Sequence, residues 1–296
     1  MKRKTLLIPA FALLVILNSC QKDVIDDNFH ADPQPGITSA TTESSDGARG
    51  VLKGYPSFLL STTIITTNIP PEVAESQTPI DIQTHQTVKF LSSTPFIHYG
   101  SIKLSDVENN EGETLKINLS AEDKANNYVV IAGKKYTLNQ FHFHYTSEHA
   151  INGRYTKMEI HFVNIAADNS YIVLGVLVDF GLSNHTLQTL FDASPTVPGG
   201  VNELEERIDL KRLFPEKISK YFTYSGSLTT PNYGPASNNT NGGPVTWIVF
   251  KDQQRLSSEQ FHQYKEIYEE SNFRLTQPLN GRKVYEHIGH IDHDRL

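Results

Sequence analysis

The chain has 296 residues and a formal net charge of −7 at pH 7. Hydrophobic residues make up 38% of it and aromatic residues 10%, which is enough for a folded core and argues against disorder over most of the length. The acidic balance repels polyphosphate and therefore disfavours nucleic acid as a partner. The single cysteine, Cys20, lies near the N-terminus, so any metal in the folded part must be held by His, Asp or Glu.

The N-terminal residues have the pattern of a bacterial lipoprotein leader. Basic residues 2–4 precede the apolar run Leu6–Leu17, which is too short for the roughly 20 residues that span a bilayer. The run ends in LNSC, which resembles a lipobox with Cys20 as the lipidated residue; an ordinary signal peptide with an incidental cysteine is the alternative. Loss of residues 1–19 as a signal peptide would leave a net charge of −10. Gln21 directly follows Cys20, and this pattern resembles that of lipoproteins sorted to the outer membrane. The domain is then expected to face the periplasm or the cell surface.

Residues 20–54 are expected to comprise the lipidated cysteine and a flexible tether. The stretch 21–50 is rich in Asp, Ser, Thr, Pro and Gly, and Phe29 is its only aromatic residue. It shows neither the helical nor the strand periodicity of apolar residues. A tether of this kind reaches roughly 30 Å for about 30 residues, so the domain can stand off a membrane surface.

Residues 55–286 are expected to form a single, mainly β domain of the α+β class. The run Tyr171–Phe180 is nearly all apolar, as in a central strand covered on both faces. This pattern predicts a large central, mostly antiparallel twisted β-sheet. The other expected strands are Phe96–Leu104, Thr114–Leu119, Tyr128–Ile131, Tyr136–Tyr145, Lys157–Asn164 and Val245–Phe250.

The expected helices are few, small and peripheral. Asn184 is placed to cap a short helix through Phe191. Ser257 and Gln260 form a capping box ahead of apolar residues at helical spacing. Residues 287–296 are expected to be a solvated tail with three histidines, His287, His290 and His293.

Two segments place three histidines where they can share one metal ion. In QFHFHY, residues 140–145, strand alternation puts His142 and His144 on one face and the aromatic residues on the other. In MEIHFVN, residues 158–164, His161 is the third candidate. Three imidazoles suit zinc, and three protein ligands rather than four leave the open position of a catalytic site.

A hairpin is expected to bring the two segments together, because the Asn-Gly pair at 152–153 is a strong turn signal. With that pair at the centre of the turn, His144 lies opposite His161. A bulge near Glu148 would shift the register by two and place His142 opposite His161 instead. Directly opposed residues have Cβ atoms about 5 Å apart, so the three rings converge in either register.

These segments are similar to those of the α-class carbonic anhydrases, over residues 76–283. QFHFH, SEH at 147–149 and MEIHFV resemble the zinc-binding part of that family in its short-loop bacterial form. SQTPIDI, VLGVLVDFG, YFTYSGSLTTP, VTWIV, RLSSEQF and QPLNGR resemble further family segments. The resemblance implies an enzyme that uses Zn²⁺ for the reversible hydration of carbon dioxide to bicarbonate and a proton by zinc-bound hydroxide.

The resemblance also implies a role for each site residue. The three histidines are the metal ligands, and Gln140 and Glu159 orient ligand imidazoles from outside. Thr229 accepts a hydrogen bond from the zinc hydroxide and donates its own to Glu148. The implied substrate pocket consists of Val163, Val173, Leu228, Thr230 and Trp247.

Glu113 falls where the family often has its proton-accepting histidine. A carboxylate at its reference pKa takes a proton from the zinc-bound water at a cost of about 3.7 kcal/mol. Nearby Lys116 opposes a rise of that pKa. The enzyme is therefore expected to work but to rely on external buffer, with His98 and His149 as the next candidates for the shuttle.

Two other functions remain open at the level of the sequence. One is a non-catalytic carbonic-anhydrase-like module that binds partners at the cell surface; the other is a zinc esterase. The complete ligand set and Thr229 disfavour the first, since a pure binder has no use for an open metal position. The sequence leaves the oligomeric state open.

Overall fold

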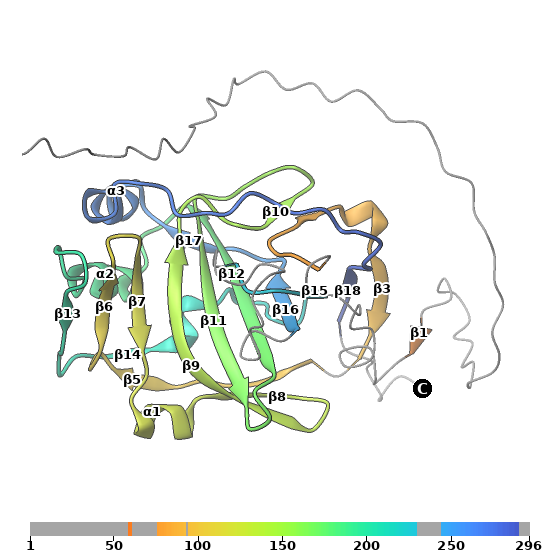
Figure 1. Cartoon of the computed structure of the whole chain (residues 1–296), viewed down its shortest axis with the longest axis horizontal. Coiled ribbons are helices and arrows are strands. Elements are labelled where there is room, and N and C mark those ends of the chain that lie inside the picture. Colours follow the sequence, from red (N-terminus) through yellow and green to blue (C-terminus); the bar gives the residue numbers. More distant parts are fainter. Residues whose placement is uncertain (1–58, 61–75, 93, 230–243, 290–296) are drawn as a thin grey trace, which may run out of the picture. The chain divides into compact units, whose positions relative to one another are not determined.

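The centre of the protein is a fourteen-stranded mixed sheet (Figure 1). The computed structural model describes residues 59–60, 76–92, 94–229 and 244–289, so the expected leader and tether lie outside it. The strand order is β1 (Leu59–Leu60), β3 (Val88–Leu91), β18 (Tyr285–His287), β15 (Tyr221–Gly226), β16 (Val245–Phe250), β12 (Tyr171–Phe180), β11 (Met158–Ala166), β9 (Lys134–His144), β7 (Thr114–Asn118), β6 (Val107–Asn110) and β13 (Val201–Asn202). Beside this path, β17 (Gln254–Leu256) pairs with β12, and β8 (Tyr128–Ile131) joins β4 (Phe96–His98) to β9.

Most neighbouring strands are antiparallel, which confirms the expected fold class. The parallel pairs of the main sheet are those of β12 with β16 and β17, and of β3 with β1 and β18. β12 lies inside the sheet and is buried along most of its length, as its apolar sequence predicts. A strand in this position has both faces covered by side chains from other elements.

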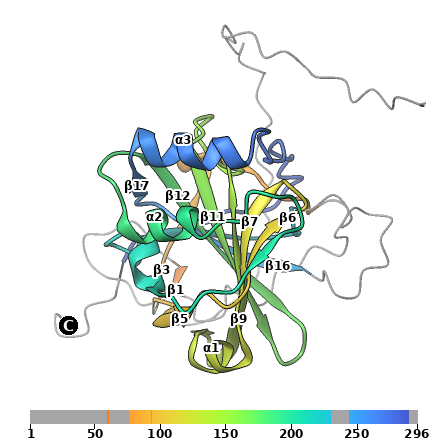
Figure 2. The ribbon, with the colours of Figure 1, turned by 90° about the vertical axis from the view of Figure 1, so that its left-hand side faces the viewer.

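Two hydrophobic clusters cover the two faces of the sheet. The larger one includes residues of α2 (His185–Asp192) and α3 (Ser258–Ile267), which lie in front of the strands in Figure 2. Both helices begin at the expected residues, since Asn184 caps α2 and Ser257 forms the capping box of α3. A third helix, α1 (Ala121–Asn126), was not expected. No helix among the described residues is long and apolar enough to cross a membrane.

Two small two-stranded sheets accompany the main sheet. β2 (Asp81–Ile82) pairs with β10 (Ala150–Ile151), and β5 (Ser101–Lys103) pairs with β14 (Arg207–Asp209). Two 3-10 helices, η2 (Thr84–Gln86) and η3 (Leu210–Leu213), follow β2 and β14.

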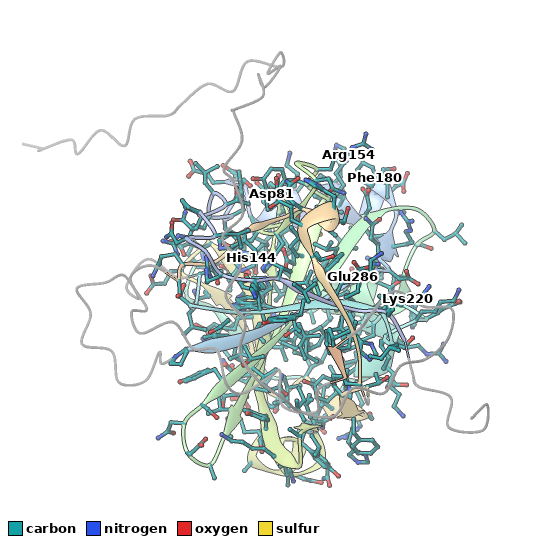
Figure 3. All side chains as sticks on the ribbon, turned by 90° about the vertical axis from the view of Figure 1, so that its right-hand side faces the viewer. Asp81, His144, Arg154, Phe180, Lys220 and Glu286 are labelled. Carbon is teal, nitrogen blue, oxygen red and sulfur yellow. The ribbon has the colours of Figure 1, made fainter. Side chains whose placement is uncertain are left out.

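The expected Asn-Gly turn is present beside β10. Asn152 and Gly153 both have positive φ, at 51° and 74°, as a two-residue hairpin turn requires. Asp81 accepts a hydrogen bond of 2.9 Å from the backbone N–H of Gly153. Asp81 and Arg154 accordingly lie at the same end of the sheet in Figure 3.

The expected single strand Phe96–Leu104 is wrong, because the structure divides it between two sheets as β4 and β5. Gly100 lies at the division. Its N–H donates to the side chain of Asn127 at 2.8 Å, and its carbonyl accepts from the N–H of Leu210 at 3.1 Å. These bonds take the backbone of Gly100 out of the ladder.

The expectation that His287 belongs to a solvated tail is also wrong. His287 is fully buried in β18, where its ring stacks on Tyr221 at 4.7 Å. Its two ring nitrogens face the carbonyl oxygens of Ser219 and Ser92. His290 and His293 lie outside the described residues.

Candidate metal centre

Three histidines come together where β9 and β11 lie side by side. His142 and His144 project from one face of β9, while Phe141 and Phe143 belong to the core on its other face, as the strand period predicts. His161, on β11, lies directly opposite His142.

The pairing register is therefore the shifted one, and the expectation that His144 faces His161 is wrong. The turn is centred as expected, with Ile151 bridged to Arg154. Between the Ile151–Arg154 bridge and the paired part of β9 and β11, however, the segment before the turn has two more residues than the segment after it. The extra residues lie in the segment 145–149, which leaves the ladder so that β10 can pair with β2.

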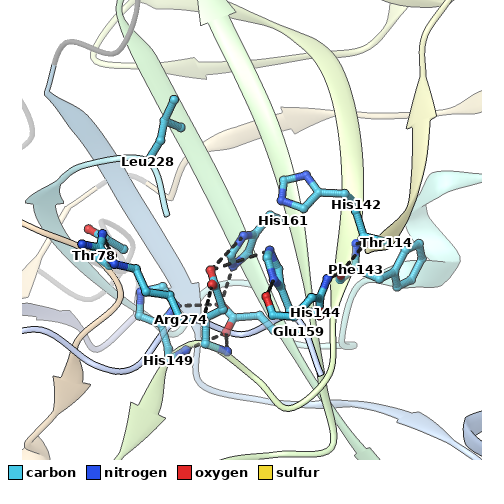
Figure 4. Close-up of polar contacts among 12 residues, drawn as sticks. Thr78, Thr114, His142, Phe143, His144, His149, Glu159, His161, Leu228 and Arg274 are labelled. Atoms are coloured by element: carbon cyan, nitrogen blue, oxygen red, sulfur yellow. Dashed lines mark hydrogen bonds and ion pairs between the residues drawn. The ribbon is translucent and has the colours of Figure 1, made fainter. Parts of the chain in front are cut away.

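The three rings converge on one point (Figure 4). Their centroids are 5.0 Å apart for His142 and His144, 5.3 Å for His142 and His161, and 4.6 Å for His144 and His161. One nitrogen from each ring can be chosen so that all three lie within 4.8 Å of one another. His161 and His144 are buried, while His142 is half-buried. A single small cation can thus contact all three.

Each ring has one nitrogen that already faces a partner outside the centre. Nδ1 of His142 lies 2.9 Å from Oε1 of Gln140, and Nδ1 of His144 lies 3.1 Å from the carbonyl oxygen of Asn272. Nε2 of His161 lies 3.0 Å from Oε1 of Glu159. The nitrogens that do not face these partners are Nε2 of His142, Nε2 of His144 and Nδ1 of His161. A metal-binding histidine needs such a partner on its other nitrogen to fix its tautomer.

Three buried polar atoms at the centre have no hydrogen-bond partner among the described residues. They are Nε2 of His144, Nε2 of His161 and Oε2 of Glu148. Of these, Nε2 of His161 still has the Oε1 of Glu159 at 3.0 Å. Oε2 of Glu148 lies 3.6 Å from Nε2 of His144 and 3.8 Å from Nδ1 of His161. Buried polar atoms are normally paired, so Nε2 of His144 and Oε2 of Glu148 indicate a cation-binding site. Three imidazole nitrogens with a nearby carboxylate fit zinc.

The surroundings set the charge of each imidazole differently. Burial, followed by the neighbouring His144 and His161, holds the pKa of His142 well below its usual value. Burial also lowers the pKa of His144, against the opposing effect of Glu148. Burial disfavours the charged form of His161 as well, but the Glu159 and Glu148 carboxylates outweigh it and raise its pKa. His142 and His144 are therefore neutral at pH 7, which is the form that binds a metal.

Glu159 anchors a buried network behind His161. Its Oε1 lies 2.7 Å from Nδ1 of His149, whose Nε2 lies 2.7 Å from the hydroxyl of Tyr224. Burial would raise the pKa of Glu159, but His149 and His161 hold it well below its usual value. Gly175, opposite His161 on β12, leaves the space for this carboxylate, since a Cβ there would lie 2.8 Å from Oε1.

An apolar wall lies beside the metal centre. Gln140, Val163, Val173 and Trp247 are paired in sequence across β9, β11, β12 and β16. Val163 is two residues from His161, so both project from the same face. Leu228 packs against this cluster. The structure thus brings together four of the five expected pocket residues, and the fifth, Thr230, lies outside the described residues.

The arrangement expected for the proton-transfer residues is only partly present. Thr229 and Glu148 are both buried, but the expected hydrogen bond between them is not formed, because Oε2 of Glu148 has no hydrogen-bond partner and its Oε1 accepts from the N–H of Arg274 at 2.8 Å. Glu113 is exposed in the turn between β6 and β7. Its role as proton acceptor stays a prediction.

Reasoning from the residues did not find Asn272, Arg274 or Gly175. Asn272 acts through its backbone carbonyl and Arg274 through its backbone N–H, and these groups do not depend on the side chain. Gly175 did carry a signal, because a glycine inside an apolar strand often marks a close approach of another group. His149 was noted only as a possible proton shuttle, whereas the structure places it in the Glu159 network.

Comparisons with known proteins agree with this geometry. A family model described as eukaryotic-type carbonic anhydrase matches residues 67–288. Carbonic anhydrases from a Nostoc species and from Neisseria gonorrhoeae are each 34% identical, over 73% and 72% of this chain and 78% and 77% of their own. The solved α-carbonic anhydrase of Thermovibrio ammonificans, in complex with the inhibitor sulfanilamide, has a TM-score of 0.64 and 38% identity over 72% of this chain and 88% of its own. That of Photobacterium profundum has a TM-score of 0.61 and 32% identity over 71% and 89%.

The mixed sheet, the three convergent imidazoles and the apolar wall define an enzyme of the α-carbonic anhydrase class. The chain belongs to the carbonic anhydrase family. It catalyses the reversible hydration of carbon dioxide to bicarbonate and a proton.

Proposed function

We propose that this activity depends on one zinc ion held by Nε2 of His142, Nε2 of His144 and Nδ1 of His161. The observation that carries the proposal is that the other nitrogen of each ring already faces a partner, so these three are the ones left to bind a metal. Zinc bound there would act as a Lewis acid and lower the pKa of a bound water towards neutrality, which is the established behaviour of carbonic anhydrase sites.

The surrounding residues would prepare this site for the reaction. Gln140 and Glu159 hold imidazoles in the tautomer that presents the correct nitrogen. With zinc bound, Thr229 would orient the reacting oxygen and donate its hydroxyl hydrogen to Glu148. Glu113 is the candidate acceptor for the proton that leaves.

Carbon dioxide would bind against the apolar wall. The substrate is small and nonpolar, so it needs an apolar surface and few polar contacts. The wall is adjacent to His161 and includes four of the expected pocket residues, Val163, Val173, Leu228 and Trp247.

The zinc proposal is tested by elemental analysis and by carbon dioxide hydration with and without a chelator. We expect about one zinc per chain, loss of activity on chelation and its return on adding zinc. His161→Ala should bind no zinc, whereas His262→Ala, at an exposed histidine of α3, should bind it normally. Absence of zinc from the wild-type chain after exposure to the metal would refute the proposal.

We further propose that the chain binds primary aromatic sulfonamides at the same site. The support is the 38% identical Thermovibrio enzyme, which was solved with sulfanilamide. Displacement of sulfanilamide by a zinc chelator would support binding at the metal, and binding that survives metal removal would contradict it.

We also propose that the chain is an outer-membrane lipoprotein, anchored through Cys20, with its domain facing the periplasm or the cell surface. The support is the order of three features in the leader, namely basic residues, then an apolar run, then the LNSC motif. Cys20→Ser should release or misprocess the chain. Wild-type chain that is wholly soluble, with a free N-terminus at Cys20, would refute the anchor.

A further inference from the structure

One cross-strand row of the sheet carries charged side chains up to the metal centre. Glu108 on β6 lies opposite Lys116 on β7, and Lys116 lies opposite His142 on β9. His142 in turn lies opposite His161. Directly opposed residues of antiparallel strands project from the same face, so all four side chains lie on the face of the metal centre.

Glu108 fixes the position of Lys116 in this row. Nζ of Lys116 lies 2.8 Å from Oε2 of Glu108, and the same oxygen accepts a hydrogen bond of 3.0 Å from Nδ2 of Asn118. Asn118 also donates to Asp106 at 3.1 Å. Burial would raise the pKa of Glu108, but the bonds from Lys116 and Asn118 lower it, so this carboxylate is ionised at neutral pH.

Ligands can approach the metal centre from the side of Lys116. His144 and His161 are only 7% and 1% exposed, whereas His142 and Gln140 are half-buried. The side chain of Lys116 is 28% exposed. Its charge also lies close to the centre, because Lys116 is directly opposite His142 and directly opposed residues have Cβ atoms about 5 Å apart.

We propose that Lys116, held by Glu108, forms an anion subsite beside the metal centre and favours metal-bound ligands that carry a second negative charge. The ligand class is a zinc-binding group joined to a carboxylate or another oxyanion. Among the described residues, the wall formed by Val163, Val173 and Trp247 is uncharged, so it does not discriminate ligands by charge, whereas the side of Lys116 can. The proposal rests on the zinc site and on sulfonamide binding proposed above.

The test compares three para-substituted benzenesulfonamides on the zinc-loaded chain by titration calorimetry. Sulfanilamide is neutral, para-carboxybenzenesulfonamide is an anion, and para-aminomethylbenzenesulfonamide is a cation. The measured quantity is the ratio of anion affinity to neutral affinity, because a change in zinc loading or folding affects both and cancels. Lys116→Met should lower this ratio roughly threefold and Glu108→Gln should raise it by a similar factor, as suits a partly exposed pair.

The control variant is Lys103→Met. It removes the β5 lysine that pairs with the exposed Glu205 and should leave the ratio unchanged. The cation should show the opposite trend in Lys116→Met. An unchanged ratio in Lys116→Met, or an equal change in Lys103→Met, would overturn the subsite while sulfanilamide binding still supported the zinc site. A wild-type chain that binds no sulfanilamide would refute the sulfonamide site and the subsite together.

Discussion

Replacing Glu159 with glutamine removes one buried charge and should weaken both the metal centre and the fold. Glu159 is fully buried, and its Oε2 accepts the N–H groups of Glu148 at 2.9 Å and His149 at 2.8 Å. Its Oε1 lies 2.7 Å from Nδ1 of His149 and 3.0 Å from Nε2 of His161. Glutamine cannot satisfy both sides, because its amide has only one acceptor oxygen.

Either orientation of the new amide has a cost. If its NH₂ faces the two backbone N–H groups, these lose their acceptor, at about 1–3 kcal/mol for each group. If its NH₂ faces the rings, His161 must carry its proton on Nδ1, which is the nitrogen that the metal needs. We therefore expect the zinc dissociation constant of Glu159→Gln to rise roughly 10- to 100-fold. The free energy of unfolding of the metal-free chain should fall by about 2–4 kcal/mol.

Chelator competition measures the first quantity and chemical denaturation the second. The matched control is Glu286→Gln, which changes another buried carboxylate, hydrogen-bonded to Thr87 at 2.7 Å. This control should destabilise the fold without changing zinc affinity. A folded Glu159→Gln chain that binds zinc as tightly as the wild type would show that Glu159 does not set the tautomer of His161.

Three further predictions concern turnover and pH. Thr229→Ala should keep zinc but lose about 2–4 kcal/mol of transition-state stabilisation in stopped-flow hydration; an unchanged rate would make Thr229 a turn residue only. Turnover should climb with imidazole concentration, and Glu113→His should raise it at low buffer; buffer-independent turnover would contradict this. Burial favours neutral Glu286, but bonds from Lys251 and Thr87 outweigh it and lower its pKa. Wild type should therefore be more stable than Glu286→Gln by about 1 kcal/mol above the unfolded pKa of ~4.3, and this difference should vanish as pH falls through the folded pKa.

The convergence of the three histidines could be predicted from the sequence because strand alternation is a local property. His142 and His144 are two residues apart, so any strand through them places both on one face. The Asn-Gly turn then required the segment containing His161 to return beside them. Apolar β12 and the caps at Asn184 and Ser257 were predictable for the same reason, since each depends on residues within one turn or strand.

The register and the outer partners could not be predicted because they depend on distant segments. The two-residue shift follows from the pairing of β10 with β2, whose residues precede it by about 70 positions in the chain. The carbonyl of Asn272 reaches His144 across 128 residues. His287 was assigned to the tail together with His290 and His293, whereas its burial depends on Tyr221 and Phe90 of other strands.

The division of the metal-centre face into a polar and an apolar side follows from the geometry of the sheet. His161 and Val163 are successive residues on one face of β11, so their cross-strand rows lie about 7 Å apart and a ligand at the metal can touch both. Towards β12 these rows continue as Gly175 and Val173. Gly175 leaves room for Glu159, so a substitution there would disturb Glu159 and, through it, His161. Towards β7 the His161 row continues through His142 to Lys116, which lies on a strand that contributes no metal ligand. Ligand preference can therefore change at β6 and β7 by substitutions that leave the metal-binding strands intact.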